Sequence, residues 1–401
     1  MKVLLADALH AAAVEQLEAA GDEVTRLPDL DADTLPDAIS DHEVLVVRST
    51  IVTAAALDAA NGLGLIVRAG AGTNTIDCDR AAELGIFVCN VPGKNALAVA
   101  ELTMGLLVAV DRHIAAATAD LRAGTWNKTA YSKADGLFGR RMGIIGVGDI
   151  GIATATRASA FGIEVVAVAK SGRSSAAIAR AEAAGIRWVD DLEELLTSSD
   201  IVSLHVPGAP DTKGLVDAEF LATMKQGAIL LNTSRGDIID EAALIDAMNE
   251  RGLRAGLDVF ADEPGSGTAD FDSDLAKHPS VVATHHVGAS TAQAQDAVTA
   301  GTLETINAYR TGSPINCVNL DPVPTRAATL TVRHHDRVGV LANVLQALRN
   351  EQLNVSNMQN RVFAGSKAAV ASIDVGHLPS QALIDEVMSL DDVIYVSVTP
   401  A

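Results

Sequence analysis

The chain has 401 residues, 48% hydrophobic and 20% charged, a length and composition that predict two or three folded domains and exclude a disordered chain. Its formal net charge of −21 argues against nucleic-acid and membrane partners, because phosphate backbones and anionic lipids repel an acidic surface. Three scattered cysteines exclude a disulfide framework and, with no leader peptide and no apolar run of about 18 residues, predict a cytoplasmic protein.

Short apolar runs alternate with alanine-rich helical stretches from the first residues onward. Strands are predicted over 3–6, 44–48 and 66–67, with helices over 11–20 and 53–61. A long apolar helix is predicted over 96–119, where it would bridge two lobes. A second series of strands is predicted over 142–146, 164–168, 201–205, 228–232, 255–258 and 281–284. This repeated βαβ pattern predicts two flavodoxin- or Rossmann-like lobes, each with a doubly wound parallel sheet.

The pattern changes after Tyr309. Residues 321–324 (DPVP) are predicted to form a stiff linker. The rest follows the order β-α-β-β-α-β of an α+β ferredoxin-like domain, with elements over 329–334, 340–349, 354–363, 367–375, 381–389 and 393–398. We therefore expect three domains. They are a discontinuous substrate-binding lobe (1–94 and 288–320), a dinucleotide-binding Rossmann domain (95–287) and a regulatory or dimerisation domain (325–401).

A GxGxxG motif at Gly146, Gly148 and Gly151 follows a predicted strand and opens a helix predicted over 149–160. The glycines permit a tight turn, close approach to a pyrophosphate and close helix–strand packing, and the helix start offers free N–H groups. A structural turn is the weaker interpretation because a strand and a helix flank the motif. The helix start, Asp149 and Ile150, is expected to bind the cofactor through its backbone, with the Asp149 carboxylate pointing outward.

The next predicted strand ends without the acid that holds the adenosine ribose of NAD. Lys170, Ser171 and Arg173 follow it instead. Two bases and a hydroxyl suit a 2′-phosphate, which a carboxylate would reject. The alternative is a solvated loop, so the predicted cofactor is NAD, with NADP left open.

Three motifs end predicted strands at the carboxyl edge of the second sheet, where open α/β folds bind ligands. They place Arg235, Glu263 and His286 on one rim. Oxidation of an alcohol needs a base for the hydroxyl proton, which a histidine provides, and a neighbouring carboxylate fixes its tautomer. An arginine binds a carboxylate through two parallel hydrogen bonds. Taken singly, each residue also has a structural interpretation, as a capping ion pair, a solvated acid or a core histidine.

The motifs NTSRGDIIDEAAL (232–244), GLDVFADEP and HHVGAS resemble those of the D-isomer-specific 2-hydroxyacid dehydrogenases, over about residues 3–401. The resemblance implies that Arg235 binds the substrate carboxylate and carbonyl, that Glu263 partners the histidine and that His286 is the acid/base. His286 is preferred to His285 because it directly precedes the hydrophobic residue of the GAS motif.

The same resemblance implies the other cofactor contacts. Asp258 would contact the nicotinamide amide. Further contacts are expected from Val206, Pro207, Thr233, Ser234, Arg235, His286, Gly288 and Ala289.

The resemblance also implies a substrate site in the first lobe. The matching positions are Arg48, Ser49, Arg68, Gly70 and Asn95, with Lys128 reaching the site of a neighbouring subunit. A phosphorylated acid with about three negative charges needs such local bases, because the net charge of the chain opposes it. Lys94 departs from the family pattern and would add charge to the pocket. Surface ion pairs remain the alternative for Arg48 and Arg68.

The last 75 or so residues resemble an ACT domain, a regulatory βαββαβ unit that pairs across subunits and binds amino acids. The expected regulatory residues are His334, Asp336, Gly339 and Asn354, with L-serine as the effector. Val338 and Asp336 replace the usual proline and asparagine, so a plain dimerisation domain stays open. No metal site is predicted, because adjacent histidines on a strand point to opposite faces.

The family resemblance implies an enzyme that oxidises D-3-phosphoglycerate to 3-phosphohydroxypyruvate, the first step of L-serine biosynthesis, as a homodimer or homotetramer. An NADP-dependent glyoxylate or hydroxypyruvate reductase is the nearest alternative, which the C-terminal domain argues against. A non-enzymatic, co-repressor-like dinucleotide sensor is the alternative from another class.

Overall fold

The computed structural model describes residues 1–9, 11–264, 267–321 and 326–401. It separates the chain into two compact units, Met1–Asn319 and Leu320–Ala401. Most of the predicted linker over 321–324 lies outside the described residues. Among the residues described, no helix is both long enough and apolar enough to cross a bilayer.

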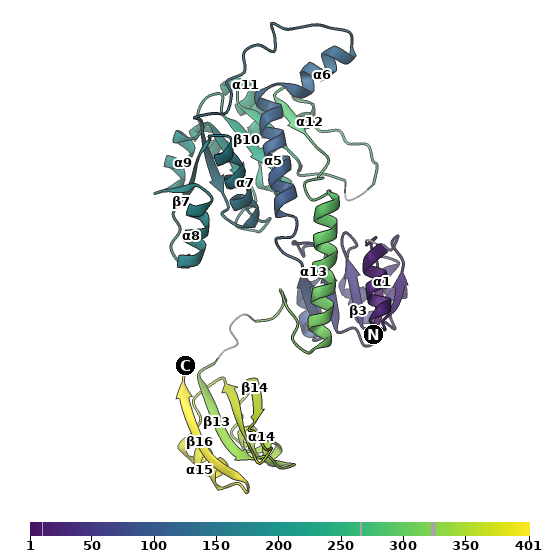
Figure 1. Ribbon diagram of the computed structural model, residues 1–401, viewed down its shortest axis with the longest axis vertical. Helices are drawn as coiled ribbons and strands as arrows, with labels where there is room; N and C mark the ends of the chain where they lie inside the picture. Colours follow the sequence, from purple (N-terminus) through teal and green to yellow (C-terminus); the bar gives the residue numbers. More distant parts are fainter. Residues whose placement is uncertain (10, 265–266, 322–325) are drawn as a thin grey trace. The chain divides into compact units, whose positions relative to one another are not determined.

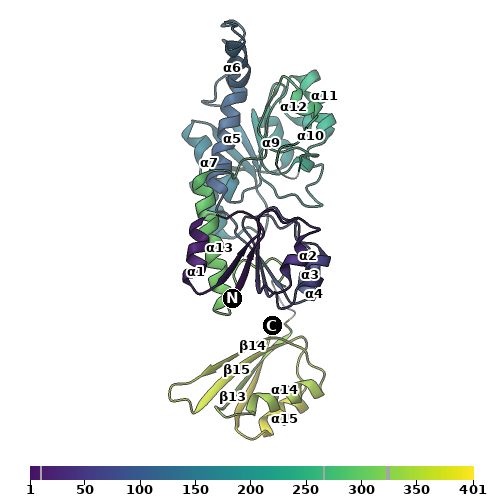
Figure 2. The same cartoon turned by 90° about the vertical axis from the view of Figure 1, so that its right-hand side faces the viewer.

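The first sheet of the larger unit has five parallel strands in the flavodoxin-like order 2-1-3-4-5. They are, in spatial order, β2 (Glu23–Arg26), β1 (Lys2–Leu5), β3 (Val44–Val47), β4 (Leu65–Arg68) and β5 (Phe87–Asn90). One face packs against α2 (Leu35–Ile39), α3 (Ala54–Ala59) and α4 (Cys78–Glu83), and the other against α1 (Ala11–Ala19) and α13 (Ala292–Arg310). Figure 2 shows these two helical layers on opposite sides of the sheet.

The second sheet has seven parallel strands and lies between two helical layers (Figure 1). Its spatial order is β12 (Val281–Ala283), β11 (Arg254–Leu257), β10 (Ile229–Asn232), β9 (Ile201–Leu204), β6 (Arg141–Ile145), β7 (Glu164–Val168) and β8 (Ile186–Val189). One layer contains α5 (Ala96–Asp111), α7 (Asp149–Ala160) and α8 (Ser175–Ala183). The other contains α9 (Leu192–Ser198), α10 (Ala218–Thr223), α11 (Glu241–Arg251) and α12 (Asp274–Lys277). The order reverses between β6 and β9, the switch point at which such sheets bind ligands.

The single long helix predicted over 96–119 is wrong. The structure has two helices, α5 and α6 (Ile114–Arg122), because His113 adopts a left-handed conformation (φ 52°) that breaks the helical hydrogen-bond ladder. Asp111 anchors the end of α5 from a fully buried position, where it accepts a hydrogen bond from Arg140 (3.3 Å). Beyond this point the chain loses its packing partners, and α6 has no buried residue.

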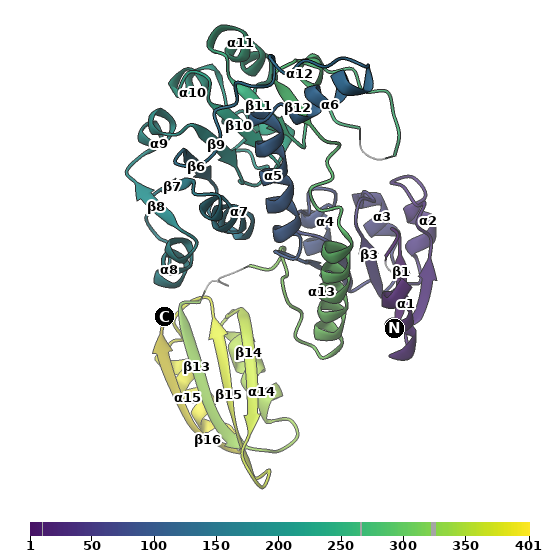
Figure 3. The ribbon, with the colours of Figure 1, turned by 45° about the horizontal axis from the view of Figure 1, so that its top comes forward.

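The smaller unit has one four-stranded antiparallel sheet with two helices on one face (Figure 3). Its elements are β13 (Ala328–His335), α14 (Val340–Asn350), β14 (Val355–Val362), β15 (Ala368–Val375), α15 (Gln381–Ser389) and β16 (Val393–Pro400). The spatial order is β14-β15-β13-β16. The β-α-β-β-α-β succession and its α+β character agree with the sequence prediction.

Candidate active site

The predicted site residues of the second lobe follow strand ends that meet at one edge of its sheet. Because β6, β7 and β9 to β12 run parallel, the segments after them all emerge at the carboxyl edge. The predicted residues on this edge are Gly146, Gly148, Lys170, Val206, Pro207, Thr233, Ser234, Arg235, Asp258 and His286.

The loop that carries Arg235 is held by Asn232, a buried residue at the end of β10. The Asn232 side chain donates to the Arg235 carbonyl (2.8 Å) and accepts from the Ser234 backbone and hydroxyl (3.0 and 2.7 Å). The next residue must be a glycine, because a Cβ on Gly236 would lie 1.9 Å from the Phe260 carbonyl carbon. This turn therefore fixes the backbone from which the Arg235 guanidinium extends.

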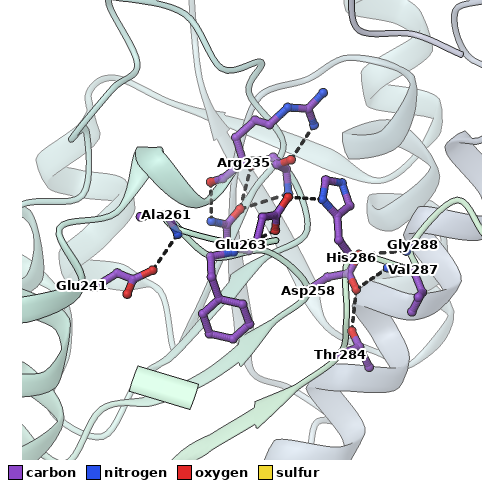
Figure 4. A network of polar contacts seen from close by, with 12 residues as sticks. Arg235, Glu241, Asp258, Ala261, Glu263, Thr284, His286, Val287 and Gly288 are labelled. Atoms are coloured by element: carbon purple, nitrogen blue, oxygen red, sulfur yellow. Dashed lines mark hydrogen bonds and ion pairs between the residues drawn. The ribbon is translucent and has the colours of Figure 1, made fainter. Parts of the chain in front are cut away.

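Glu263 and His286 come from different loops and face each other (Figure 4). The Glu263 carboxylate pairs with His286 Nδ1, and its second oxygen accepts from the Phe260 backbone N–H (3.2 Å). Burial raises the pKa of Glu263, but the His286 hydrogen bond and charge, the Phe260 hydrogen bond and Arg235 together lower it below its ordinary value. The carboxylate is thus kept ionised beside an imidazole whose side chain is 47% exposed.

Asp258 shapes the segment that presents the histidine. Its carboxylate, in a residue only 1% exposed, accepts from the Thr284 hydroxyl (2.6 Å) and from the backbone N–H groups of Val287 (2.9 Å) and Gly288 (2.8 Å). His286 itself has a left-handed backbone (φ 53°) and donates its N–H to the Asp258 carbonyl (2.7 Å). The predicted nicotinamide contact of Asp258 stays a prediction; in this structure both carboxylate oxygens bind the 284–288 segment.

Replacing Asp258 with Ala is expected to lower the free energy of unfolding by about 2–4 kcal/mol, because two backbone N–H groups and one hydroxyl lose their charged acceptor. Urea unfolding followed by circular dichroism measures the change. Asp246→Ala, at an exposed position on α11, is the matched control and should stay within about 0.5 kcal/mol of the parent. Equal stability of the two variants would contradict this role of Asp258.

Arg48 follows β3 and Arg68 is the last residue of β4, and their charges act together with that of Arg235. Burial, followed by the charges of Arg235 and Arg48, lowers the pKa of Arg68 to about 10. Gly70 makes room for Arg68 and Gly72 makes room for Arg235, since a Cβ on Gly70 would lie 1.6 Å from Arg68 Nη1 and one on Gly72 2.8 Å from Arg235 Nη2. Two guanidinium groups of the first lobe and one of the second therefore lie close together. This arrangement suits a multiply charged anion.

The turn that carries Arg48 is held by Asp7, which follows β1. One Asp7 carboxylate oxygen accepts from the backbone N–H groups of Arg48 (2.6 Å), Ser49 (3.0 Å) and Thr50 (3.1 Å). This contact orients the Arg48 backbone. It also engages the Ser49 N–H in a hydrogen bond to the protein itself. Sequence reasoning missed Asp7; its position directly after an apolar strand was the available signal.

Lys94 and Asn95 lie between β5 and α5, where the chain passes from the first lobe to the second. Asn95 is the residue before α5, and its side chain makes no capping hydrogen bond. The stem of Lys94 lies over Gly301 of α13, where a Cβ would be 3.3 Å from Lys94 Cε. The substrate contact of Asn95 and the charge of Lys94 in the pocket stay predictions.

Lys128 is far from the other substrate residues within one chain. Sixteen residues of α5, about 24 Å of helix, and then α6 separate it from Asn95. Every residue from 121 to 130 is exposed. A role for Lys128 at the site of a neighbouring subunit stays a prediction.

The glycine-rich turn fits a dinucleotide. Gly146 has a positive φ of 104°, and a Cβ on it would lie 2.3 Å from the His205 carbonyl oxygen. A Cβ on Gly151 would lie 2.1 Å from the Gly146 carbonyl oxygen, whereas Gly148 has nothing within 4 Å. The first and last glycines are required by packing, and the middle one leaves open space in front of the α7 N-terminus for a pyrophosphate.

Asp149 is exposed, and Arg180 of α8 pairs with it (2.5 Å). The ion pair offsets a carboxylate that would otherwise oppose bound phosphates. The sequence offered no local signal for Arg180.

The remaining cofactor residues lie along the same edge. Thr233 is buried, and its hydroxyl hydrogen-bonds to that of Thr103 on α5 (2.9 Å), a contact that sequence reasoning missed. Pro207 accepts from the Thr212 hydroxyl (2.7 Å). Gly288 has a tight setting, since a Cβ there would lie 2.9 Å from the Asp258 carboxylate.

The four predicted regulatory residues do not come together within one chain. Asp336 and Gly339 lie in the turn after β13, which ends beside Ala368, whereas Asn354 precedes β14, which begins beside Val375. These are opposite ends of the sheet. His334 is buried, and its ring contacts Asn360 Oδ1 (3.2 Å) rather than solvent. A single chain therefore lacks the predicted four-residue site.

The paired sheets, the glycine-rich turn and the arginine, glutamate and histidine at the sheet edge are those of the two-lobed, dinucleotide-binding oxidoreductases. Residues 104–288 match the family profile "D-isomer specific 2-hydroxyacid dehydrogenase, NAD binding domain". D-3-phosphoglycerate dehydrogenase of Haemophilus influenzae is 33% identical over 405 residues, covering 98% of this chain and 96% of that protein. The chain belongs to the D-isomer-specific 2-hydroxyacid dehydrogenase family and carries its NAD-binding domain.

Two further similarities bear on function. D-3-phosphoglycerate dehydrogenase of Methanocaldococcus jannaschii is 39% identical over 327 residues, which cover 81% of this chain but 60% of that protein. The chain thus spans little more than half the length of several curated relatives. A glyoxylate reductase from Paecilomyes thermophila superposes with a TM-score of 0.70 at 25% identity, over 79% of this chain and 98% of that one.

Proposed function

We propose that the chain oxidises D-3-phosphoglycerate to 3-phosphohydroxypyruvate with NAD, the first step of L-serine biosynthesis. The observation that carries this choice is the convergence of Arg48, Arg68 and Arg235 beside the Glu263–His286 pair. A carboxylate and a phosphate on one three-carbon substrate match three arginines better than an unphosphorylated acid does. The relatives named D-3-phosphoglycerate dehydrogenase support the same substrate.

The protein's own groups then act as follows. Arg235 binds the substrate carboxylate and aligns the C2 hydroxyl with His286. Because Glu263 occupies Nδ1 of His286, the Nε2 atom is left to take the hydroxyl proton, and the carboxylate stabilises the imidazolium that forms. Bound NAD supplies the hydride acceptor. The turn from Gly146 to Gly151 holds its pyrophosphate.

We also propose three domains. Residues 1–94 and 288–320 form the substrate-binding lobe, residues 95–287 form the cofactor domain, and residues 325–401 form an ACT domain. The antiparallel sheet and the β-α-β-β-α-β succession support it. An L-serine site that uses Asp336, Gly339 and Asn354 would need two chains, because these residues lie at opposite ends of one sheet.

A second copy of this chain is the proposed partner of α6 and the segment that follows it. This arm has no buried residue in α6 and exposes Leu121 and Trp126, the latter by 80%. Burying these side chains in a homodimer, or in a homotetramer that also uses the C-terminal sheets, would remove apolar surface from water.

Substrate phosphate recognition is tested by comparing D-3-phosphoglycerate with D-glycerate. Replacing Arg48 or Arg68 with Ala is expected to lower kcat/KM for phosphoglycerate at least about 30-fold and to change that for glycerate less than about threefold. Arg80→Ala, at a half-buried position on α4 away from this site, is the control. Equal losses on both substrates would contradict phosphate binding by these arginines.

The alternative of a glyoxylate or hydroxypyruvate reductase is favoured by one observation, the basic loop after β7. The glyoxylate reductase with the same fold supports it. Its signature would be NADPH-dependent reduction of glyoxylate or hydroxypyruvate without turnover of 3-phosphoglycerate.

A further inference from the structure

Two of the three cysteines meet across the edge of the first sheet, although 228 positions separate them in the chain. Cys89 lies on β5, and Cys317 lies on a segment, residues 316–319, that pairs antiparallel with this edge strand. Their Sγ atoms are 3.0 Å apart. We propose that Cys89 and Cys317 form a reversible disulfide when the protein meets a small-molecule disulfide, and that this bond clasps residues 316–319 to β5.

The backbone pairing puts the two side chains in the arrangement that a disulfide needs. Asn90 donates its N–H to the Asn316 carbonyl (3.2 Å), and Val318 donates its N–H to the Val88 carbonyl (2.8 Å). These two bonds flank the cysteines, which therefore form a non-hydrogen-bonded antiparallel pair. In such a pair the Cα atoms are about 4.5 Å apart and the side chains are close together. This separation falls within the range of about 4.4–6.8 Å that disulfides span, so the bond can form within the existing backbone pairing.

The same segment is held to β5 by polar contacts on both sides of the cysteine. The Asn319 side chain accepts from the Val88 N–H through Oδ1 (2.9 Å) and donates to the Ile86 carbonyl through Nδ2 (2.8 Å). Asn316 turns the chain with a left-handed backbone (φ 56°), a conformation that asparagine tolerates better than most residues. These contacts keep the two thiols aligned in the reduced protein, before any reaction takes place.

The environments of the two thiols give them different roles. Cys89 is fully buried in the apolar core of the first lobe, in a cluster that includes Val67, Val91 and Ile306. Burial, followed by the hydrogen bond and charge of the neighbouring Cys317, raises the pKa of the Cys89 thiol above its ordinary value. Cys317 is only partly buried. A small disulfide therefore reacts first with Cys317, and Cys89 is the thiol that resolves the intermediate.

The proposed reaction is a two-step exchange with a low-molecular-weight disulfide such as oxidised glutathione. The Cys317 thiolate attacks one sulfur of the small disulfide and breaks its S–S bond, and the released small thiolate takes up the proton that Cys317 lost. Cys89 then loses its proton and attacks the Cys317 sulfur of the mixed disulfide, and the second small thiolate leaves with that proton. Two protein thiols are oxidised by two electrons in all, and one small disulfide is reduced to two thiols.

The bond would join the two separate parts of the first lobe at the point where the lobe ends. β5 is the last strand of the first part, and residues 316–319 come directly before the C-terminal unit, which begins at Leu320. In the reduced protein only non-covalent contacts hold these residues to β5, whereas a disulfide prevents their separation for as long as it lasts. Oxidation therefore fixes the point from which the C-terminal unit extends. This inference does not depend on the proposed substrate or cofactor.

The first test identifies the bond. The full 401-residue chain is reduced with dithiothreitol, freed of reductant and incubated with oxidised glutathione. Free thiols are then alkylated, and mass spectrometry of a non-reduced digest shows which cysteines are joined. We expect a linked peptide pair that contains Cys89 and Cys317, an alkylated Cys78, and full reversal by dithiothreitol. Cys317→Ala should abolish the bond, and Cys78→Ala, at the third and also partly buried cysteine, is the matched control that should still form it.

Hydrogen–deuterium exchange measures the clasp itself. Amide exchange in peptides that cover residues 86–90 and 316–319 is expected to slow about tenfold or more on oxidation, because the hydrogen bonds of this edge must then open while the two segments stay joined. The same treatment of Cys317→Ala should leave the exchange rates of residues 86–90 unchanged.

The outcomes decide the inference without involving dehydrogenase activity. A reversible bond between Cys89 and Cys317 together with slower exchange supports it. Glutathione attached to Cys317 without a bond to Cys89, bonds that involve Cys78, or three free thiols after oxidation would overturn it. A Cys89–Cys317 bond that leaves exchange unchanged would also overturn it, because residues 316–319 would then be held no more tightly than before. The proposed function is tested separately, by turnover.

Discussion

Replacing His286 with Asn is expected to lower kcat for 3-phosphoglycerate oxidation by roughly 10²–10⁴-fold while leaving NADH affinity within about twofold. Asn keeps a polar side chain of similar size but cannot take the hydroxyl proton. The Glu263 carboxylate, which the structure pairs with Nδ1, then loses the cation it would stabilise. Steady-state kinetics and fluorescence titration of NADH on the same preparation measure the two quantities.

The adjacent histidine provides the matched control. His285 is exposed at the preceding position, and none of the described contacts joins it to Glu263. His285→Asn should keep kcat within about threefold. If His285→Asn abolished turnover while His286→Asn retained it, the assignment of the acid/base would be wrong. A dinucleotide sensor would retain partner binding in both variants.

Replacing Arg235 with Lys is expected to lower kcat/KM about 10²-fold or more, and Arg235→Ala still further. A guanidinium forms two parallel hydrogen bonds with a carboxylate, whereas an ammonium keeps the charge but not this geometry. The structure positions Arg235 through the Asn232 turn and leaves space for it opposite Gly72 and Gly208.

Two measurements separate a substrate role from a structural one. The melting temperature of Arg235→Lys should stay within a few degrees of the parent, because Asn232 holds Arg235 through its backbone carbonyl, which the substitution leaves in place. The control Arg80→Lys, on α4, should leave kcat/KM within about twofold. A normal kcat/KM in Arg235→Lys would contradict bidentate binding of the substrate carboxylate.

Much of the fold follows from local patterns. β7, α7 and α15 have the bounds predicted from the sequence, because each is a short apolar or periodic run between strong turn signals. β2 (EVTR) and β8 (IRWV) were not predicted, because edge strands carry polar residues and lack the continuous apolar run of a buried strand. The break between α5 and α6 has no composition signal; it lies at His113, whose left-handed backbone conformation ends the helical hydrogen-bond pattern.

The candidate site, like the fold, was only partly predictable from the sequence. The sequence motifs identified Arg235, Glu263 and His286. Only the tertiary structure shows that Glu263 pairs with a histidine 23 positions away. Asp7 acts on a turn 41 positions away and Arg180 on Asp149 31 positions away, so neither pairing has a local signal. The regulatory residues stay a prediction, and the sequence did not show that Asn354 and Gly339 lie at opposite ends of one antiparallel sheet.

The most direct test of the central claim is the initial rate of 3-phosphoglycerate oxidation by the full chain, run in parallel with NAD and with NADP. Mildly alkaline pH favours the forward reaction, because oxidation releases a proton. The account predicts turnover of 3-phosphoglycerate that disappears in His286→Asn. No turnover with either cofactor, together with NADPH-dependent reduction of glyoxylate or hydroxypyruvate, would contradict it and identify the chain as a reductase.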